Sequence, residues 1–302
     1  MSSHFENQYA QNRLPGAPSF LSSAIQYEVI IGSVAYGVSN DSSDMDVYGF
    51  AIPPKDFVFP QLRGEILGFD DFNLKFEQYQ QHHIFDESAL GGKGRTYDFT
   101  FYSIVKYFRL LMDNNPNIID SLFVPDNCVL HSTDIGDMVR KNRQLFLHKG
   151  CWAKFKGYAY SQMHKIRTKN PEGKRKALVD EHGYDVKFAY HVVRLLDEVE
   201  QLLLHHDMDL RRNAEQLKSI RRGEWSLMQL EDYFKHKEAD LEKVYLASTL
   251  PDKANPDVIR QLLTDCLEQY FGSLSVVVSQ QNVAELAVKE MQAVLKRYEA
   301  KL

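Results

Sequence analysis

The first half of the chain alternates between short apolar runs and polar connections, a pattern that favours strands. Residues 27–31 and 46–52 are rich in β-branched and aromatic side chains, and a pair of prolines stops the second run. Residues 96–102 place aromatic and polar side chains at alternating positions, which predicts a strand with one face on a core. The polar, glycine-containing segment 78–95 predicts a mobile loop or a hairpin with a long tip.

Helical spacing of apolar residues replaces the strand pattern from about residue 125 onward. Helices are expected over residues 103–112, 118–123, 134–147, 151–168, 183–206, 213–222, 226–247 and 256–272, with a further helix-rich stretch over 274–302. We therefore expect an α+β fold, in which a small mixed β-sheet domain over residues 21–125 is followed by an all-helical domain over residues 126–302. Residues 1–20 are polar and end in a proline- and glycine-containing stretch, which predicts a flexible lead-in.

The net charge of −5 conceals an uneven distribution of charge. Between Arg140 and Lys176 there are twelve Lys or Arg residues and one acidic residue, Glu172. Such a block favours an anionic partner, either a triphosphate or a nucleic acid, although a solvated helix face would show the same composition. The near absence of acidic residues within the block favours the anionic partner.

The cysteines and the apolar runs bear on the compartment. Cys128, Cys151 and Cys266 are far apart and odd in number, which argues against a disulfide framework or a zinc site and favours a reducing, cytoplasmic location. No apolar run is long enough to span a bilayer, and the polar N-terminus lacks the apolar core of a secretory signal. We therefore expect no membrane partner, while the sequence leaves the oligomeric state open.

Two carboxylates lead into the second predicted strand. Asp44 and Asp46 are two positions apart, so both project from the same face. Carboxylates at this spacing repel one another unless a cation lies between them, which makes them candidate ligands of Mg²⁺. Gly32 and Ser33 end the preceding strand, where a tight turn and its N–H groups can hold phosphate. Asp98, on the polar face of the strand expected over residues 96–102, is the candidate for a third carboxylate.

The spacing of these residues resembles a known signature. Gly-Ser followed at this distance by Asp-x-Asp is similar to the DNA polymerase beta superfamily of nucleotidyltransferases, and the fuller pattern resembles its RNA repair pathway (RlaP-like) branch. The residues that carry the fuller pattern are Gly32, Ser33, Ala35, Tyr36, Gly37, Ser43, Asp44, Asp46 and Gly49. Later segments resemble the same branch, so the likeness extends over roughly residues 27–272. Val34 departs from the pattern at a position next to Ser33 where a basic residue is expected, which puts one phosphate contact in question.

The resemblance implies an enzyme that moves NMP from an NTP to an acceptor hydroxyl and releases pyrophosphate. Asp44, Asp46 and Asp98 would be the catalytic carboxylates and the ligands of two Mg²⁺ ions, for which Mn²⁺ could substitute. The implied acceptor is an RNA end, similar to that of tRNA, and the basic block agrees with a polyanionic acceptor. A protein or a small molecule as acceptor, or a non-catalytic nucleotide-binding regulator, are the alternatives. The presence of all three carboxylates speaks against the last of these.

Helical spacing adds candidates for nucleotide binding beside Gly32 and Ser33. Tyr184, Lys187 and His191 share one face of the helix expected over residues 183–206. Ser161 and Lys165 repeat this spacing on the helix expected over residues 151–168. A solvated or structural helix face would show the same pattern.

Basic residues at two places are candidates for contact with the acceptor. Lys93 and Arg95 lie in a glycine-rich segment just before Asp98, and Lys154 and Lys156 lie in the basic block. The adjacent histidines at 82–83 and 205–206 point apart on any regular element, so we expect them to be surface residues rather than metal ligands.

Overall fold

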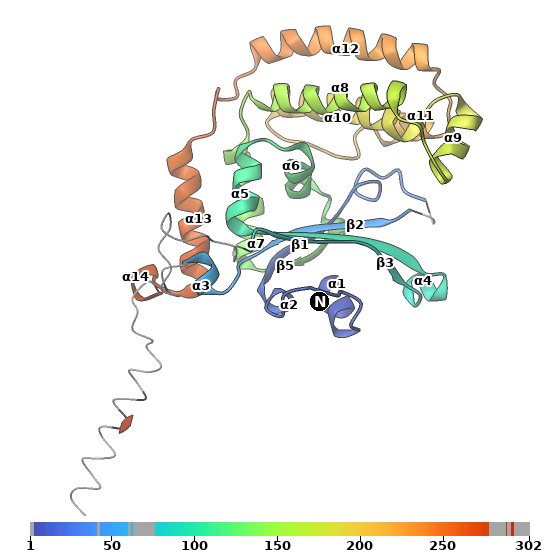
Figure 1. Cartoon of the computed structure of the whole chain (residues 1–302). Helices are drawn as coiled ribbons and strands as arrows, with labels where there is room; N and C mark the ends of the chain where they lie inside the picture. The colour runs from blue at the N-terminus through green and yellow to red at the C-terminus, as the bar shows by residue number, and fades with distance from the viewer. Residues whose placement is uncertain are drawn as a thin grey trace, which may run out of the picture.

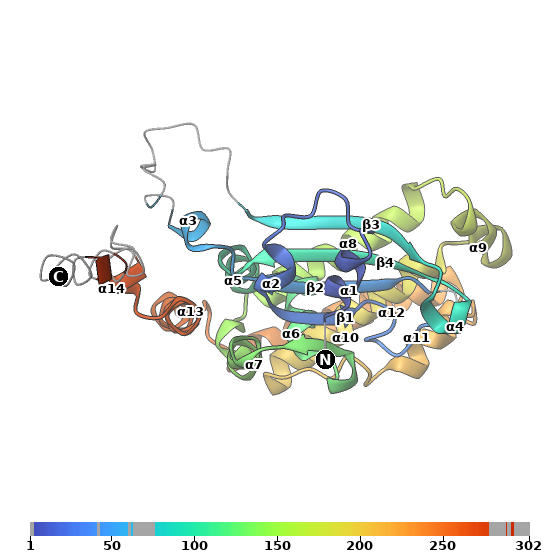
Figure 2. The same cartoon turned by 90° about the horizontal axis from the view of Figure 1, so that it is seen from below.

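The computed structural model describes residues 3–40, 43–59, 62, 76–277, 288 and 291–292. These residues form a mixed β-sheet with most of the helices layered over one face, whereas the N-terminal part of the chain lies against the other face (Figure 1). Figure 2 views the molecule from the side of that N-terminal part, with the sheet in front of the helical layer. The arrangement confirms the predicted α+β fold.

The described part of the sheet has five strands in the order β3-β4-β2-β1-β5. Their bounds are β1 (Ile25–Ile31), β2 (Met45–Ala51), β3 (Gln78–Asp86), β4 (Arg95–Ser103) and β5 (Val129–Ser132). β2 and β4 pair in parallel, and the other neighbours pair antiparallel. The parallel register places Asp46 opposite Asp98, so these side chains project from the same face of adjacent strands. The segment 78–95, expected as a loop or a hairpin, is a hairpin whose tip contains α4 (Ala89–Gly92).

Residues 3–24 contain two helices, where the sequence predicts a flexible lead-in over residues 1–20. α1 (His4–Ala10) begins with a capping box between Ser3 and Glu6, and α2 (Leu21–Ala24) leads directly into β1. The fully buried ring of Phe5 packs edge-on against Phe101 at a centroid distance of 5.0 Å. A seven-residue helix with two aromatic residues, Phe5 and Tyr9, one turn apart is too short to show a periodicity, so this helix escapes prediction from the sequence pattern.

Two helices cover the sheet on the side of the helical layer. α5 (Ile104–Met112) begins at Ser103, whose hydroxyl accepts a hydrogen bond of 3.2 Å from the backbone N–H of Lys106. α6 (Pro116–Phe123) begins with proline at its first position and is buried along most of its length. α6 packs against β1, which is buried at every position, whereas α5 packs against β4 and β2. Together these contacts form the core beneath the candidate site. Two further elements are short: α3 (Lys55–Val58) follows β2 in the chain, and η2 (Asp126–Cys128) directly precedes β5.

The remaining helices follow the predicted order, with two differences. Their bounds are α7 (Asp134–Lys141), η3 (Arg143–Phe146), α8 (Cys151–Thr168), α9 (Lys174–His182), α10 (Val186–His205), α11 (Ala214–Arg221), α12 (Leu227–Ala247), α13 (Pro256–Phe271) and α14 (Leu274–Val277). The helix expected over 134–147 is divided at Asn142 into α7 and η3, and α9 was not predicted because its charged sequence lacks an apolar stripe. The stretch 274–302 lies mostly outside the described residues. None of the described helices is long and apolar enough to cross a membrane.

α10 is the central helix of the layer, because it packs against α8, α11 and α12 and its residues are buried around most of its circumference. β5, beyond residue 125, completes the sheet beside β1, and α13 returns to lie beside α5 and α7 (Figure 1). The division into domains at residue 125 stays a prediction, since elements beyond it pack into the sheet region.

Candidate active site

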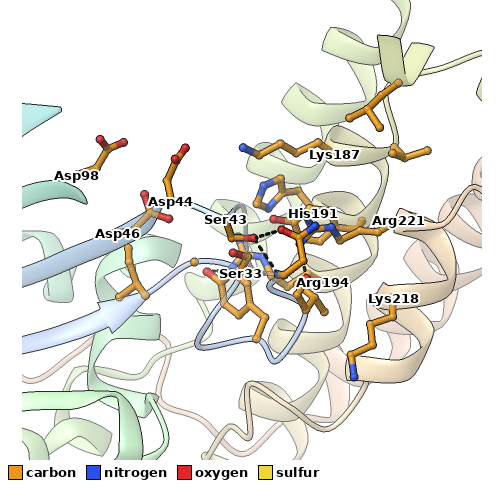
Figure 3. A pocket seen from close by; sticks show the side chains of 18 of the residues that line it. Ser33, Ser43, Asp44, Asp46, Asp98, Lys187, His191, Arg194, Lys218 and Arg221 are labelled. Atoms are coloured by element: carbon orange, nitrogen blue, oxygen red, sulfur yellow. Dashed lines mark hydrogen bonds between the residues drawn. The ribbon is translucent and has the colours of Figure 1, made fainter. Parts of the chain in front are cut away.

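A cavity of about 740 Å³ lies between the sheet and the helices α10 and α11. Its sheet side is formed by the ends of β1 and β2 and the connection between them, and its helical side by side chains of α9, α10 and α11. Figure 3 shows the two walls: Asp44, Asp46 and Asp98 lie on one side, Lys187, Arg194 and Arg221 on the other, and Ser33 lies between them. The cavity therefore has an acidic wall facing a basic wall.

The acidic wall brings the three predicted carboxylates to one cavity. Asp46 on β2 and Asp98 on β4 are register partners, and Asp44 immediately precedes β2. Burial, with smaller contributions from the charges of Asp98 and Asp44, raises the pKa of Asp46 to about 6. A cation between these carboxylates would offset the unfavourable charge that its two neighbours impose on Asp46.

The donor set fits a magnesium site that is completed by substrate. Among the described residues, no three His, Cys, Asp or Glu side chains converge closely enough to hold a metal ion alone. Mg²⁺ commonly takes only one or two protein carboxylates and fills its remaining positions with water and substrate phosphates. Three carboxylates facing one cavity fit that open kind of site, and they do not form a closed cage.

Asp98 has neighbours that the sequence pattern did not indicate. One carboxylate oxygen accepts a hydrogen bond of 2.7 Å from the backbone N–H of His83, and the other lies 3.3 Å from Nδ1 of His82. The register of β3 against β4 shifts between Gln81 and Ile84, and His83 has a φ of +58° at this bulge. The two histidines are exposed, as expected, and the bulge brings both of them next to the carboxylate of Asp98.

The turn after β1 lies directly beneath the carboxylates. Gly32 has a φ of +69°, and a Cβ atom at this position would lie 2.3 Å from Oδ2 of Asp46. Only glycine therefore allows the turn to pass so close to that carboxylate. The turn is closed by backbone hydrogen bonds from Tyr36 to Gly32 (3.1 Å) and from Val38 to Ser33 (2.9 Å). This conformation places Ser33 on the cavity beside Asp46 (Figure 3).

Side chains from the helical part of the chain hold this turn in place. Arg211 donates from Nε to the carbonyl oxygen of Ala35 at 3.1 Å, and Arg221 donates from Nη1 to the carbonyl oxygen of Val38. Arg211 lies between α10 and α11, whereas Arg221 is the last residue of α11. The phosphate-binding turn predicted from Gly32 and Ser33 is thus fixed from the opposite wall.

A buried ionic cluster makes the third connection to the turn. Nη1 of Arg194 donates to Asp120 on α6, to Glu198 (3.1 Å) and to the hydroxyl of Tyr36 (2.5 Å), and that hydroxyl donates to Asp120 (2.8 Å). Burial raises the pKa of both Asp120 and Glu198, and the charge of Arg194 opposes that rise. The cluster joins the turn, α6 and α10 at one buried point.

The basic wall contains two cations without an acidic partner. Cations that line the cavity are Arg175, Lys187, Arg194, Lys218, Arg221 and Arg222. Four of them pair with a carboxylate: Arg175 with Asp185 (3.4 Å), Arg194 with Asp120 and Glu198, Lys218 with Glu215 (2.7 Å), and Arg222 with Glu224 (2.5 Å). Lys187 and Arg221 have no carboxylate partner among the described residues. These two are therefore the cations best placed to receive an external anion.

His191 lies on α10, between Lys187 and Arg194 in the sequence. Burial lowers its pKa well below the usual value, and the charges of Arg194 and Lys187 lower it further. The imidazole is consequently neutral, and it offers one donor and one acceptor to a sugar or a base instead of a charge to a phosphate.

The structure separates the predicted nucleotide-binding residues into two groups. Ser33, Lys187 and His191 line the cavity together with Gly32. Tyr184, Ser161 and Lys165 are not among the lining residues. Tyr184 is buried and its hydroxyl donates to the carbonyl oxygen of Trp225 at 2.7 Å, whereas Ser161 and Lys165 are exposed on α8.

The four acceptor candidates also lie outside the lining of the cavity. Lys93 is exposed beside α4, Arg95 begins β4, and Lys154 is exposed on α8. Lys156 contacts Glu238 at 2.8 Å and Glu242 at 3.8 Å, so its charge is already balanced.

Five lining cations were not predicted as site residues: Arg175, Arg194, Lys218, Arg221 and Arg222. Arg221 and Arg222 fall within the stretch 27–272 that resembles the family, but the sequence pattern assigns them no role. Their position at the end of a short helix far along the chain gives no local sign that they return to the turn after β1.

Comparisons with known proteins give one family match. A family model described as RNA repair pathway DNA polymerase beta family matches residues 5–246. No curated protein matches the chain. Among solved structures, a nucleotidyltransferase-like protein from Exiguobacterium sibiricum is 10% identical over 80% of this chain and 75% of that chain, with a TM-score of 0.27. That score is too low to support an argument.

Proposed function

This chain belongs to the RNA repair pathway DNA polymerase beta family, whose members are nucleotidyltransferases, and from that premise we propose a specific reaction. The protein transfers NMP from an NTP to a hydroxyl at an RNA end, releases pyrophosphate and depends on Mg²⁺. The observation that carries the proposal is an acidic wall that faces, across the turn at Gly32 and Ser33, two cations with no carboxylate partner in the described part of the chain. A triphosphate coordinated at one end and neutralised at the other fits this polarity.

Each wall has a separate task in this proposal. Asp44, Asp46 and Asp98 would hold Mg²⁺, which when bound neutralises charge on the phosphates and on the attacking and leaving oxygens. The turn at Gly32 and Ser33 offers backbone N–H groups and a hydroxyl to the β- and γ-phosphates.

The basic wall would orient the donor. Lys187 and Arg221 bind phosphate oxygens opposite the carboxylates, and the neutral His191 is available for the sugar or the base. The acceptor oxygen forms a bond to the α-phosphorus and its hydroxyl proton passes to a carboxylate of the acidic wall. The bond from that phosphorus to the bridging oxygen breaks, so pyrophosphate leaves toward the basic wall. Positioning and charge neutralisation supply most of the acceleration in this class of reaction.

Two alternative functions are distinguished from this one by the experiment described below. The acceptor hydroxyl could belong to a protein or a small molecule, since the cavity by itself does not select an acceptor. A non-catalytic nucleotide-binding regulator would have no need of all three carboxylates, and their presence in one cavity favours the enzyme.

Label transfer tests the proposal. The purified protein is incubated with each α-labelled NTP, with Mg²⁺ or Mn²⁺, and with a mixed tRNA pool, and the products are separated into RNA, protein and small molecules. We expect label in the RNA with the wild type and none with Asp44→Ala/Asp46→Ala, provided that circular dichroism shows the variant folded. Equal labelling by the wild type and the variant in all three fractions would exclude nucleotidyl transfer by this protein. Label in the protein fraction alone would show that the acceptor is a protein and not RNA.

A further inference from the structure

The basic block at 140–176 is partly neutralised by acidic residues from elsewhere in the chain. The pairs are Arg140 with Asp126, Arg143 with Asp207, Lys156 with Glu238 and Glu242, Arg167 with Glu231, and Arg175 with Asp185. Three of these six acidic partners come from α12, more than sixty positions away from the cations they meet. The surface charge of the block is therefore lower than its sequence indicates over much of its length.

Three cations of the block meet at the C-terminal end of α8 and the start of α9, and only one of them, Arg175, pairs with a carboxylate, that of Asp185. Around the ring of Phe188, Nζ of Lys165 lies 5.8 Å, Nζ of Lys169 lies 5.7 Å and Cζ of Arg175 lies 4.2 Å from the centroid. We call Lys165, Lys169 and Arg175 the Phe188 cluster. Lys165 and Lys169 are exposed and have no carboxylate partner among the described residues. The ring itself is 6% exposed, so it supports the three cations from below.

Arg175 connects the Phe188 cluster with the cavity. Its Nη1 lies 3.4 Å from Oδ2 of Asp185, and the other oxygen of Asp185 accepts from the backbone N–H of Lys187 at 2.9 Å, which caps α10. One carboxylate thus orients Arg175 and begins the helix that carries Lys187 into the cavity. Arg175 also lines the cavity, so the positive surface continues from the outside to the basic wall.

We propose that the Phe188 cluster binds the phosphodiester backbone of a single-stranded nucleic acid whose end enters the cavity. This inference rests on the proposed function, because it assigns the route by which the RNA acceptor approaches. A triphosphate is accommodated by the cavity alone, and a small acceptor needs no charge outside it, whereas a polynucleotide has phosphates both at its reacting end and several nucleotides away. Flexible lysines over an apolar floor suit a backbone read by charge and not by base.

The location differs from the acceptor residues expected from the sequence. Lys156 is held by Glu238 and Glu242, and Lys93, Arg95 and Lys154 do not line the cavity. Lys165, expected to contact the nucleotide, belongs in this proposal to the acceptor surface.

The proposal is tested by measuring how tightly the full chain binds fluorescein-labelled oligouridylate and oligothymidylate. Binding is followed by fluorescence anisotropy over a range of salt concentrations. The variant is Lys165→Ala/Lys169→Ala, and the matched control, Lys235→Ala/Lys253→Ala, removes two other exposed lysines. Removing one lysine that neutralises a phosphate of a single strand reduces the slope of log K against log salt by about 0.7, so the variant should be less steep by about 1.4 for both probes. The variant Lys165→Arg/Lys169→Arg should restore the wild-type slope, because it keeps both charges.

Equal slopes for the wild type, the variant and the control would overturn the inference, as would tighter binding of polyglutamate than of either oligonucleotide at the same salt. Thermal unfolding of each variant shows whether it is folded. The slopes are measured without NTP and are independent of the transfer reaction. Absence of label transfer with the expected slopes would refute the proposed function alone, and transfer with unchanged slopes would refute this inference alone.

Discussion

Gly32→Ala isolates the contribution of the turn to the geometry of the acidic wall. The added methyl carbon would lie 2.3 Å from Oδ2 of Asp46, whereas carbon and oxygen in contact stay more than about 3 Å apart, so the carboxylate or the turn must shift by roughly 1 Å. A misplacement of about 1 Å at reacting groups can reduce a rate about 100-fold. The substitution also places alanine at a φ of +69°, which costs about 1–2 kcal/mol of folding free energy.

Gly37→Ala is the matched control for this substitution. Gly37 lies in the same turn with a φ of +68°, but its Cβ would meet Cγ of Arg211 at 3.5 Å, an ordinary contact. Both variants should therefore lose the backbone cost of about 1–2 kcal/mol in urea unfolding, with a further loss from the clash in Gly32→Ala, while only Gly32→Ala should lose about 100-fold in label transfer from an α-labelled NTP. Near-wild-type transfer by Gly32→Ala, or an equal loss in both variants, would show that the close approach to Asp46 does not control the reaction.

Three further substitutions test the basic wall, the buried ions and the N-terminal contact. Arg221→Met should weaken NTP binding about tenfold or more in calorimetry, because it removes a charge-assisted hydrogen bond. The control Arg222→Met should change NTP binding little, because Glu224 already pairs with Arg222. Equal losses of affinity in the two variants would refute the role of Arg221. Arg194→Met should lower the free energy of unfolding by about 3–5 kcal/mol, because it leaves buried carboxylates uncompensated, and a loss below about 1 kcal/mol would contradict this. Burial raises the pKa of Glu28 to about 7, so its folded form holds a proton that the unfolded chain releases at lower pH. Stability from Glu28 is thus complete below about pH 4.5 and falls by about 3 kcal/mol as pH rises through 7, and Glu28→Gln should remove this part of the pH dependence of urea unfolding.

Local patterns sufficed for the parts of the fold that are determined by neighbours in sequence. β1, β2 and β4 and most helices were predicted because their apolar spacing is continuous over several residues. α1 was missed because its few apolar residues span only two turns. For β3 the hairpin was only one of two alternatives, because its mostly polar residues pair with β4 through backbone atoms, whose pairing does not depend on side-chain pattern. The same limit explains α9, which has no apolar stripe.

The candidate site was likewise predictable where its residues are close together in the sequence. Gly32, Ser33, Asp44 and Asp46 fall within fifteen residues, so their spacing was visible in the sequence, and strand alternation placed Asp98 on the correct face. The basic wall was visible only in part, since Lys187 and His191 share a helix face but Arg221 arrives from a separate helix. Its partners are the carbonyl oxygen of Val38 and the ring of Tyr190, at 5.4 Å, neither of which leaves a mark in the sequence.

The buried cluster around Arg194 explains how two walls from distant parts of the chain keep a fixed relation. A buried ion pair is weak evidence for stability, because desolvation offsets much of the attraction between its charges. Its hydrogen bonds are directional, however, and here they end on the hydroxyl of Tyr36 in the turn and on Asp120 beneath it. An apolar contact of equal size would allow the turn to slide over α10, whereas this cluster specifies one register. We infer that the cluster is positional: it sets the separation between the carboxylates beside the turn and Lys187 on the helix, which is the separation that a bound triphosphate must span.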